Sequence, residues 1–155
     1  MKQSINVFEK GQRALKSLNS LGAYLAKSIV EQSLLHLIYY RVSQLNGCAF
    51  CLDMHSKDLL AAGEDHQRLL VLNAWKETPF FSERERAALA FAEALTKLNG
   101  APIDNAVYNE ACCQFSEEEL IDLTFAIITI NSYNRVNIAF PNPAAVGTYT
   151  PGQYA

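Results

Sequence analysis

The sequence lacks the features that would place the protein at a membrane or on a nucleic acid. Its longest apolar runs, near residues 34–38 and 125–128, fall far short of the ~20 residues that a helix needs to cross a bilayer. Lys and Arg gather into no stripe, charged residues make up only 19% of the chain, and the formal net charge is -3. We therefore expect neither a nucleic acid nor an anionic membrane as a partner.

The N-terminus also lacks an export signal. Charged residues interrupt it too early and too often for the apolar region of a signal peptide. We therefore expect a cytoplasmic protein, in a compartment that keeps thiols reduced. In that setting the four cysteines indicate catalysis, metal binding or plain packing rather than a framework of disulfides.

No segment alternates between polar and apolar residues over any length, and no internal repeat is found. The 155 residues are the length of one domain, and half of them are hydrophobic. Apolar residues recur instead at steps of three and four, which is the period of a helix facing a core. The pattern therefore predicts an all-α fold in a single domain.

Three sequences fit the capping box of a helix start, beginning at Ser28, Ser82 and Ser116. The helix after Ser116 is so densely apolar that we expect it to be mostly buried. Another helix should end near Asn46-Gly47, because glycine commonly follows the last turn. The remaining helices are predicted over about residues 48–63, 65–76 and 102–113.

Cys48, Cys51 and His55 form the constellation that carries chemistry. Their spacing places all three on one face of a helix within two turns. Free N–H groups at a helix start stabilise a thiolate, and such motifs lower a thiol pKa from ~8.5 to about 3.5–7.5. This argument alone favours Cys48, at about the first helical position, as the more acidic thiol. His55 is one turn beyond Cys51, where it can exchange a proton with it.

A Cys-x-x-Cys pair can also hold zinc or simply fill a core. A structural zinc site normally has four ligands, and the other candidates are poorly placed. Cys112 and Cys113 are adjacent, and His66 lies beyond the expected helix end at Gly63. We therefore expect no metal and no cofactor, and interpret Cys112 and Cys113 as buried small hydrophobes. A redox-active dithiol is the best explanation of the pair.

The residues around the pair resemble a known family. The run from Tyr40 to Asp58, YRVSQLNGCAFCLDMHSKD, is similar to the core of alkylhydroperoxidase AhpD-like proteins in the carboxymuconolactone decarboxylase superfamily. The similarity implies an AhpD-like orthogonal helix bundle of about six to seven helices. It continues through residues 62–64, 67–69, 75–82, 85–89 and 133–135, and covers about residues 20–140 in all.

This coverage suggests a division of the chain into three parts. Residues 1–19 form an N-terminal arm, residues 20–140 the AhpD-like helical domain, and residues 141–155 an irregular C-terminal tail. The tail holds three of the five prolines, which is typical of a segment without regular helices.

The resemblance implies a role for each residue of the constellation. Cys51 is the thiolate that attacks a peroxide oxygen, Cys48 resolves the product as a disulfide, and His55 belongs to a proton relay. The order of the two cysteines differs from the one that the helix-start argument favours. We follow the family, because His55 lies one turn from Cys51.

The chain departs from the family at position 36. Family members usually carry a glutamate twelve residues before the first cysteine, and this chain has His36 there. A histidine can accept a proton near neutral pH, so His36 either replaces the glutamate or marks an impaired member. Glu31 and Tyr40 are the nearest alternatives for the relay.

Three functions follow as hypotheses. The leading one is a thiol-dependent peroxidase or disulfide oxidoreductase in antioxidant defence, with a hydroperoxide as substrate and a lipoyl-bearing protein or another dithiol as reductant. The second is a cofactor-free decarboxylase or lactone-processing enzyme, although that branch of the superfamily lacks the cysteine pair. The third is a non-catalytic, thiol-sensing oligomer. The resemblance also implies a homo-oligomer, either a trimer or a hexamer.

Overall fold

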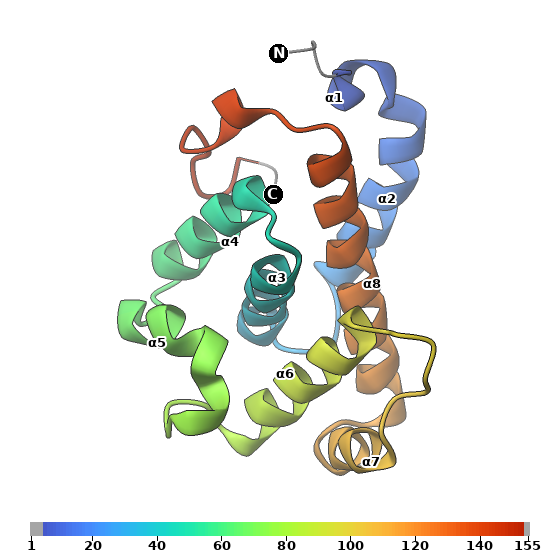
Figure 1. The fold of residues 1–155 in the computed structure, drawn as a ribbon, viewed down its shortest axis with the longest axis vertical. Coiled ribbons are helices and arrows are strands. Elements are labelled where there is room, and N and C mark those ends of the chain that lie inside the picture. Colours follow the sequence, from blue (N-terminus) through green and yellow to red (C-terminus); the bar gives the residue numbers. More distant parts are fainter. Residues whose placement is uncertain (1–4, 154–155) are drawn as a thin grey trace.

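The fold is known from a computed structural model that describes residues 5–153. Within this range all regular secondary structure is helical and no strand is present, so the predicted all-α class is confirmed (Figure 1). The described α-helices number eight, slightly more than expected. They are α1 (Val7–Lys10), α2 (Gln12–Leu25), α3 (Gln32–Asn46), α4 (Ala49–Ala61), α5 (His66–Val71), α6 (Glu83–Thr96), α7 (Asn105–Gln114) and α8 (Glu117–Ala139), and two 3-10 helices are η1 (Leu72–Glu77) and η2 (Pro143–Ala145).

Two of the three predicted capping boxes are present. The Ser82 hydroxyl accepts a hydrogen bond from the Glu85 N–H at 3.2 Å, and the Glu85 carboxylate accepts one from the Ser82 N–H at 2.7 Å. Ser116 and Glu119 make the same pair of bonds at the start of α8. Each box satisfies N–H groups that a helix start leaves without partners, which fixes where α6 and α8 begin.

The predicted capping box at Ser28 is wrong. The helix that follows, α3, begins at Gln32, and Glu31 precedes it without a side-chain cap. The Ser28 hydroxyl instead accepts a hydrogen bond from the Val30 N–H at 3.0 Å, in a turn before α3, and donates one to the Asp122 carboxylate of α8 at 2.5 Å. A charged acceptor makes a stronger hydrogen bond than a neutral one, so the bond to Asp122 helps to hold Ser28 in the turn outside α3.

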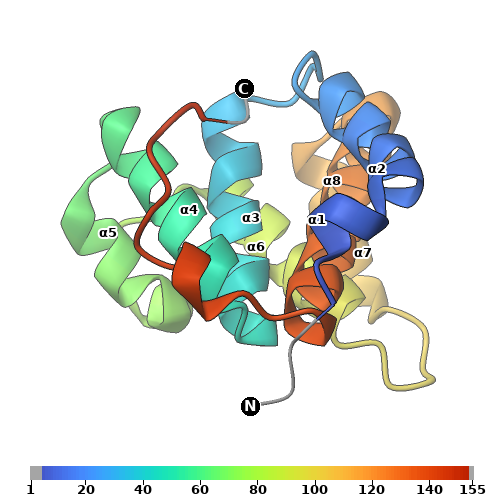
Figure 2. The ribbon, with the colours of Figure 1, turned by 90° about the horizontal axis from the view of Figure 1, so that it is seen from above.

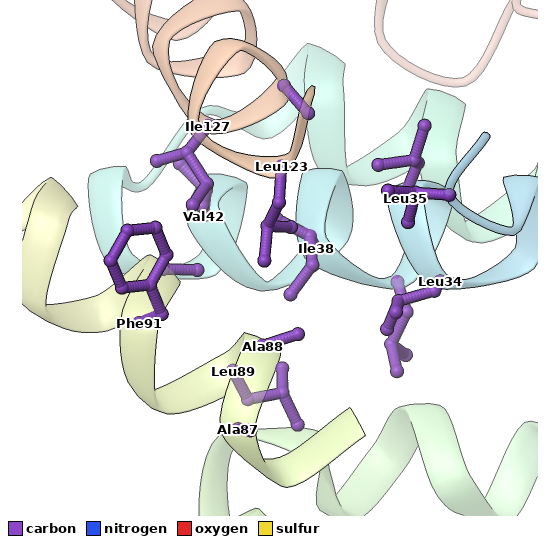
Figure 3. Close-up of a cluster of buried hydrophobic side chains, with 14 of the residues drawn as sticks. Leu34, Leu35, Ile38, Val42, Ala87, Ala88, Leu89, Phe91, Leu123 and Ile127 are labelled. Carbon is purple, nitrogen blue, oxygen red and sulfur yellow. The ribbon is translucent and has the colours of Figure 1, made fainter. Parts of the chain in front are cut away.

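Helix α3 lies at the centre of the bundle, and α4, α6 and α8 pack around it (Figure 1). Figure 3 shows the core where Ile38 and Val42 of α3 meet Leu123 and Ile127 of α8, with Phe91 of α6 close by. All five side chains are buried. Fully burying side chains of this size contributes about 1.5–3 kcal/mol each, so this contact holds α3 rigidly against its neighbours.

The expectation that α8 is mostly buried holds for only part of its surface. Ile121, Phe125 and Ile128 recur at steps of four and three along α8, and are 55%, 43% and 44% exposed. They form an apolar stripe on the outer face, opposite the residues that pack on α3. No helix within residues 5–153 combines the length and apolarity that crossing a membrane requires.

A partly buried ion pair joins α3 to α6 and η1. The Arg41 guanidinium donates to Glu93 Oε1 through Nε at 2.9 Å and Nη2 at 2.7 Å. The Trp75 indole N–H donates to the same oxygen at 2.8 Å. Burial by itself would raise the pKa of Glu93, but the hydrogen bonds from Trp75 and Arg41 outweigh it and hold the pKa below its usual range.

The segment after α8 folds back over α4, as its red trace shows in Figure 2. Lys57 Nζ donates to the carbonyl oxygens of Gly147 and Tyr149, at 3.2 and 3.0 Å. The Tyr149 hydroxyl donates to Asp58 Oδ1 at 2.8 Å, and its side chain is only 6% exposed. These bonds fasten the C-terminal segment to the outer face of α4.

Candidate redox site

The site begins at the turn between α3 and α4. Gly47 ends α3 with a φ of 69°, a left-handed conformation that glycine adopts at little cost. The Cys48 N–H then donates back to the Ser43 carbonyl at 3.2 Å. Cys48 is the N-cap residue of α4, one position earlier than the sequence predicts, and Cys51 is the third residue of the helix. The pair therefore lies at a helix start.

Cys48 and Cys51 are joined by a disulfide, with their Cα atoms 5.4 Å apart. Both residues are only 2% exposed. The Asn137 side-chain amide of α8 donates a weak hydrogen bond to Cys51 Sγ at 3.6 Å. The start of α4 therefore accommodates the oxidised form of the pair, and an N–H donor from another helix faces the sulfur of Cys51.

His55 lies one helical turn after Cys51 and is 6% exposed. Neither of its ring nitrogens has a hydrogen-bond partner among residues 5–153. Burial, with a smaller contribution from the nearby His36, lowers the pKa of His55 to about 3. The ring is therefore neutral at physiological pH when the disulfide is formed.

His36 reaches the same place from α3. Its ring meets the ring of His55 edge to face, with centroids 6.3 Å apart. Tyr39 completes the group, with its ring 5.4 Å from that of His55 and 5.7 Å from that of His36. Burial lowers the pKa of His36, against an opposing effect of the Asp58 carboxylate, and burial raises the pKa of Tyr39. The sequence-predicted His36 and His55 are thus neighbours.

Three residues near the constellation were not predicted from the sequence: Tyr39, Asp58 and Asn137. The neighbouring Tyr40 was named for the relay, because it shares a helix face with His36, but Tyr39 is the residue that contacts both histidines. Asp58 follows His55 by one helical turn, a spacing that could have revealed it. Asn137 belongs to α8, so only the tertiary fold brings it to Cys51.

Glu31, the other alternative for the relay, is engaged elsewhere. Its carboxylate accepts hydrogen bonds from the Arg84 guanidinium at 3.0 Å. This contact lowers the pKa of Glu31, so the residue is a bound anion at neutral pH. The ion pair to α6 occupies the carboxylate that the relay would have used.

A large cleft runs along the site and has a volume of about 1640 Å³. Helices α2, α3, α4 and α8 and the C-terminal segment supply its walls, which are mostly apolar. Cys51 lines this cleft, and Cys48 is not among its lining residues. The other lining residues that matter here are His36, Tyr39, His55, Asp58, Asn137 and Tyr149.

The remaining cysteines are not where the sequence interpretation placed them. Cys112 and Cys113 are both exposed on α7, so their assignment as buried small hydrophobes is wrong. Helix α7 packs mainly on α6 and buries only Ala111 fully, which leaves the next two positions facing solvent. His66 is exposed at the start of α5.

A helical bundle with a Cys-x-x-Cys disulfide beside a buried histidine is an all-α protein whose site fits a redox role. The chain belongs to the carboxymuconolactone decarboxylase family, whose model matches residues 12–94. Within that family it is AhpD-like.

Relatives of similar length support this placement. The "Uncharacterized protein YdfG" of Bacillus subtilis is 37% identical over 145 residues, which cover 94% of this chain and 99% of that protein. A solved structure from Agrobacterium tumefaciens, the protein of unknown function ATU0492, is 35% identical with a TM-score of 0.85. The alignment covers 90% of this chain and 95% of that one, which is provisionally named as the antioxidant defence protein AhpD.

The debrominase Bmp8, solved in complex with 2,3,4-tribromopyrrole, is also similar. It is 23% identical with a TM-score of 0.77, over 89% of this chain and 75% of that one. At this identity the likeness concerns the fold alone. The fold alone therefore does not decide the chemistry of this chain.

Proposed function

We propose that this protein is a thiol-dependent peroxidase of the alkylhydroperoxidase kind, which cycles Cys48 and Cys51 between dithiol and disulfide in antioxidant defence. The observation that carries the proposal is the disulfide at the start of α4, whose Cys51 lines an open cleft. Placement at a helix start favours the thiolate that such a cycle needs.

The proposed cycle has three balanced steps. The Cys51 thiolate attacks the terminal oxygen of a hydroperoxide, the O–O bond breaks, and with one proton the products are a Cys51 sulfenic acid and an alcohol. The Cys48 thiol then attacks the Cys51 sulfur, which forms the disulfide and releases water. A dithiol reductant restores both thiols and becomes a disulfide itself. In sum, the peroxide takes two electrons from the reductant.

The cleft supports the assignment of Cys51 as the attacking thiol. Cys51, although only 2% exposed, borders the cleft that a peroxide would enter, whereas Cys48 does not. The Asn137 amide N–H points at the sulfur of Cys51 and would stabilise negative charge there. Both observations favour the order that the family implies over the order that the helix start alone suggests.

His55 and His36 are proposed to carry the proton that the first step consumes. His55 lies one turn from Cys51 on α4, and His36 contacts it from α3. A pair of imidazoles can pass a proton by alternately donating and accepting at their two nitrogens. In this proposal His36 takes the place of the glutamate that the family usually carries.

Two partners are part of the proposal. The mostly apolar walls of the cleft suit an organic hydroperoxide, and the mouth would admit the arm of a lipoyl-bearing protein or another dithiol. A second copy of this chain is the expected oligomer partner, because the apolar stripe of Ile121, Phe125 and Ile128 on α8 is uncovered in one copy.

Thiol counting after peroxide treatment tests the proposal. In a protein whose Cys112 and Cys113 are both replaced by serine, the reduced form should lose two thiols per chain to cumene hydroperoxide. Cys51→Ser should abolish this loss, whereas Cys48→Ser should still lose its remaining thiol and trap a sulfenic acid. No peroxide-dependent loss near neutral pH, or a loss that survives Cys51→Ser, would contradict the proposal. His36→Glu then measures whether histidine is a working substitute for the glutamate.

A further inference from the structure

We propose that His36, His55 and Asp58 bind one divalent transition-metal ion of the zinc class. One ligand atom from each of the three side chains lies within 4.8 Å of the other two. Two imidazoles and one carboxylate are the donor set of catalytic zinc sites and of non-haem iron sites. This set is distinct from the Cys-x-x-Cys pair that sequence reasoning considered as a zinc ligand.

The fold brings the three ligands together on two rigid helices. His55 and Asp58 are three residues apart on α4, so both side chains lie on one face of that helix. His36 comes from α3, the helix that packs most closely against α4. Helix bundles build metal sites in this way, with two ligands at i and i+3 on one helix and others from a facing helix.

His55 supplies an independent sign of a missing ligand. Buried side-chain nitrogens nearly always have a hydrogen-bond partner, because losing water without compensation is unfavourable. His55 is 6% exposed, yet among residues 5–153 neither ring nitrogen has such a partner. A metal ion bound to one nitrogen would supply the contact that the protein itself does not.

Asp58 is held in a manner suited to a metal ligand. The Tyr149 hydroxyl donates to its Oδ1 at 2.8 Å, and the Gly152 N–H donates to the same oxygen at 3.3 Å. These bonds fix the carboxylate, while its Oδ2 accepts no hydrogen bond from the described residues. Outer partners of this kind commonly orient the carboxylates of metal sites.

Binding requires only a small closure of the site. The ligand atoms of a tetrahedral zinc ion are about 3.5 Å apart, so no gap has to shrink by more than about 1.3 Å. His36 is only partly buried and can make this adjustment by rotating its side chain toward the carboxylate that Tyr149 and Gly152 hold. Three protein ligands leave a coordination position open, and all three residues line the cleft. A small ligand in the cleft could therefore reach the ion.

A metal titration of the oxidised protein tests the site. The protein should be untagged, with the Cys48–Cys51 disulfide intact and with Cys112 and Cys113 replaced by serine, so that no thiol can bind metal. Co²⁺ is the probe, because its visible absorption reports coordination by nitrogen and oxygen, and Zn²⁺ competition then gives the zinc affinity. We expect one ion per chain.

Three variants and one control decide the ligands. His36→Ala and Asp58→Asn should each weaken Co²⁺ binding by at least about a hundredfold. His36→Phe keeps the ring contacts without a donor atom, and should give the same loss if the alanine variant does not fold. His66→Ala removes the third histidine of the chain, which is exposed on α5, and should leave binding unchanged.

The proposal is overturned if the background protein takes up no cobalt at millimolar concentration, or if His36→Phe and Asp58→Asn bind as tightly as the background. The titration involves neither peroxide nor a free thiol. Its outcome is therefore read independently of the peroxidase cycle, whose proton relay through His36 and His55 belongs to the metal-free form.

Discussion

Removing the charge of Glu93 should destabilise the protein in a way that depends on pH. Glu93 joins α6 to Arg41 of α3 and to Trp75 of η1, through three hydrogen bonds of 2.7–2.9 Å to a single oxygen. Glu93→Gln keeps the shape of the side chain but neutralises it. The Arg41 guanidinium, whose side chain is 9% exposed, then lies in the interior without its counter-ion.

The size of the effect follows from the burial of the pair. Breaking a fully buried ion pair costs about 3–5 kcal/mol, and an exposed pair contributes about 0–1 kcal/mol. The Arg41 and Glu93 side chains are 9% and 16% exposed, so the pair lies near the buried limit, although the amide of glutamine can still accept a hydrogen bond. We therefore expect a loss of about 2–3 kcal/mol at pH 7, or a fall in Tm of about 5–10 °C.

The sign of the pH dependence follows from the direction of the pKa shift. The pKa of Glu93 is held below its usual range in the folded protein, so its contribution is fully present above the unfolded pKa of about 4.3. The contribution is lost as the pH falls through the lower, folded pKa. The difference between the wild type and Glu93→Gln should therefore shrink at acidic pH.

Urea unfolding at pH 7 and at pH 3.5, followed by circular dichroism with the disulfide intact, measures both effects. Glu110→Gln is the matched control, because Glu110 is exposed on α7, and it should change stability by less than about 0.5 kcal/mol. A loss for Glu93→Gln below about 0.5 kcal/mol at pH 7, or one of equal size at both pH values, would refute the reasoning.

Three further predictions concern the site and its surroundings. Asn137→Leu removes the N–H donor to Cys51 and should slow iodoacetamide alkylation of that thiol in the reduced protein by about 2–10-fold. An unchanged rate would show that the amide does not stabilise the thiolate. Tyr149→Phe removes the hydroxyl bonded to Asp58 and should weaken docking of the C-terminal segment by about 1–2 kcal/mol. Amide hydrogen exchange should then be faster over residues 147–153 and unchanged in α3. In the oxidised protein a thiol reagent should count two accessible thiols per chain without denaturant, from the exposed cysteines of α7, and a count of zero would contradict their exposure.

The sequence predicted those parts of the fold that local chemistry decides. The starts of α6 and α8 follow from Ser82 and Ser116 with the glutamates three residues later, and the end of α3 follows from Gly47. The predicted start of α3 at Ser28 was wrong, because Ser28 lies in a turn where its hydroxyl accepts from the Val30 N–H and donates to Asp122, 94 residues further along the chain. No local pattern can anticipate a partner so far away.

The burial of apolar helices was harder to predict for a related reason. The sequence of α8 shows that it is apolar but not which of its faces the bundle covers, so the exposed stripe around Phe125 was missed. The same reasoning placed Cys112 and Cys113 in the core, although the short helix α7 turns them to solvent. Composition gives the tendency to be buried, whereas the packing of neighbouring helices decides which residues are.

The same contrast between local and long-range contacts explains which site residues could be predicted from the sequence. Cys48, Cys51 and His55 could be grouped from the sequence because a single helix start carries them. His36 joined them only through the family resemblance, and the structure then placed its ring against that of His55.

Position 36 gains a different meaning once Asp58 is considered with it. Compared with the family, His36 stands where a glutamate usually lies near the cysteine pair. In the structure, His36 is also one of three possible metal ligands, because its imidazole lies close to that of His55 and to the Asp58 carboxylate. The ring nitrogens of His55 have no hydrogen-bond partner within residues 5–153. A substitution that removes a carboxylate from a proton relay also supplies a nitrogen ligand next to an existing carboxylate. The exchange at position 36 can therefore change what the site binds as well as how fast it reacts.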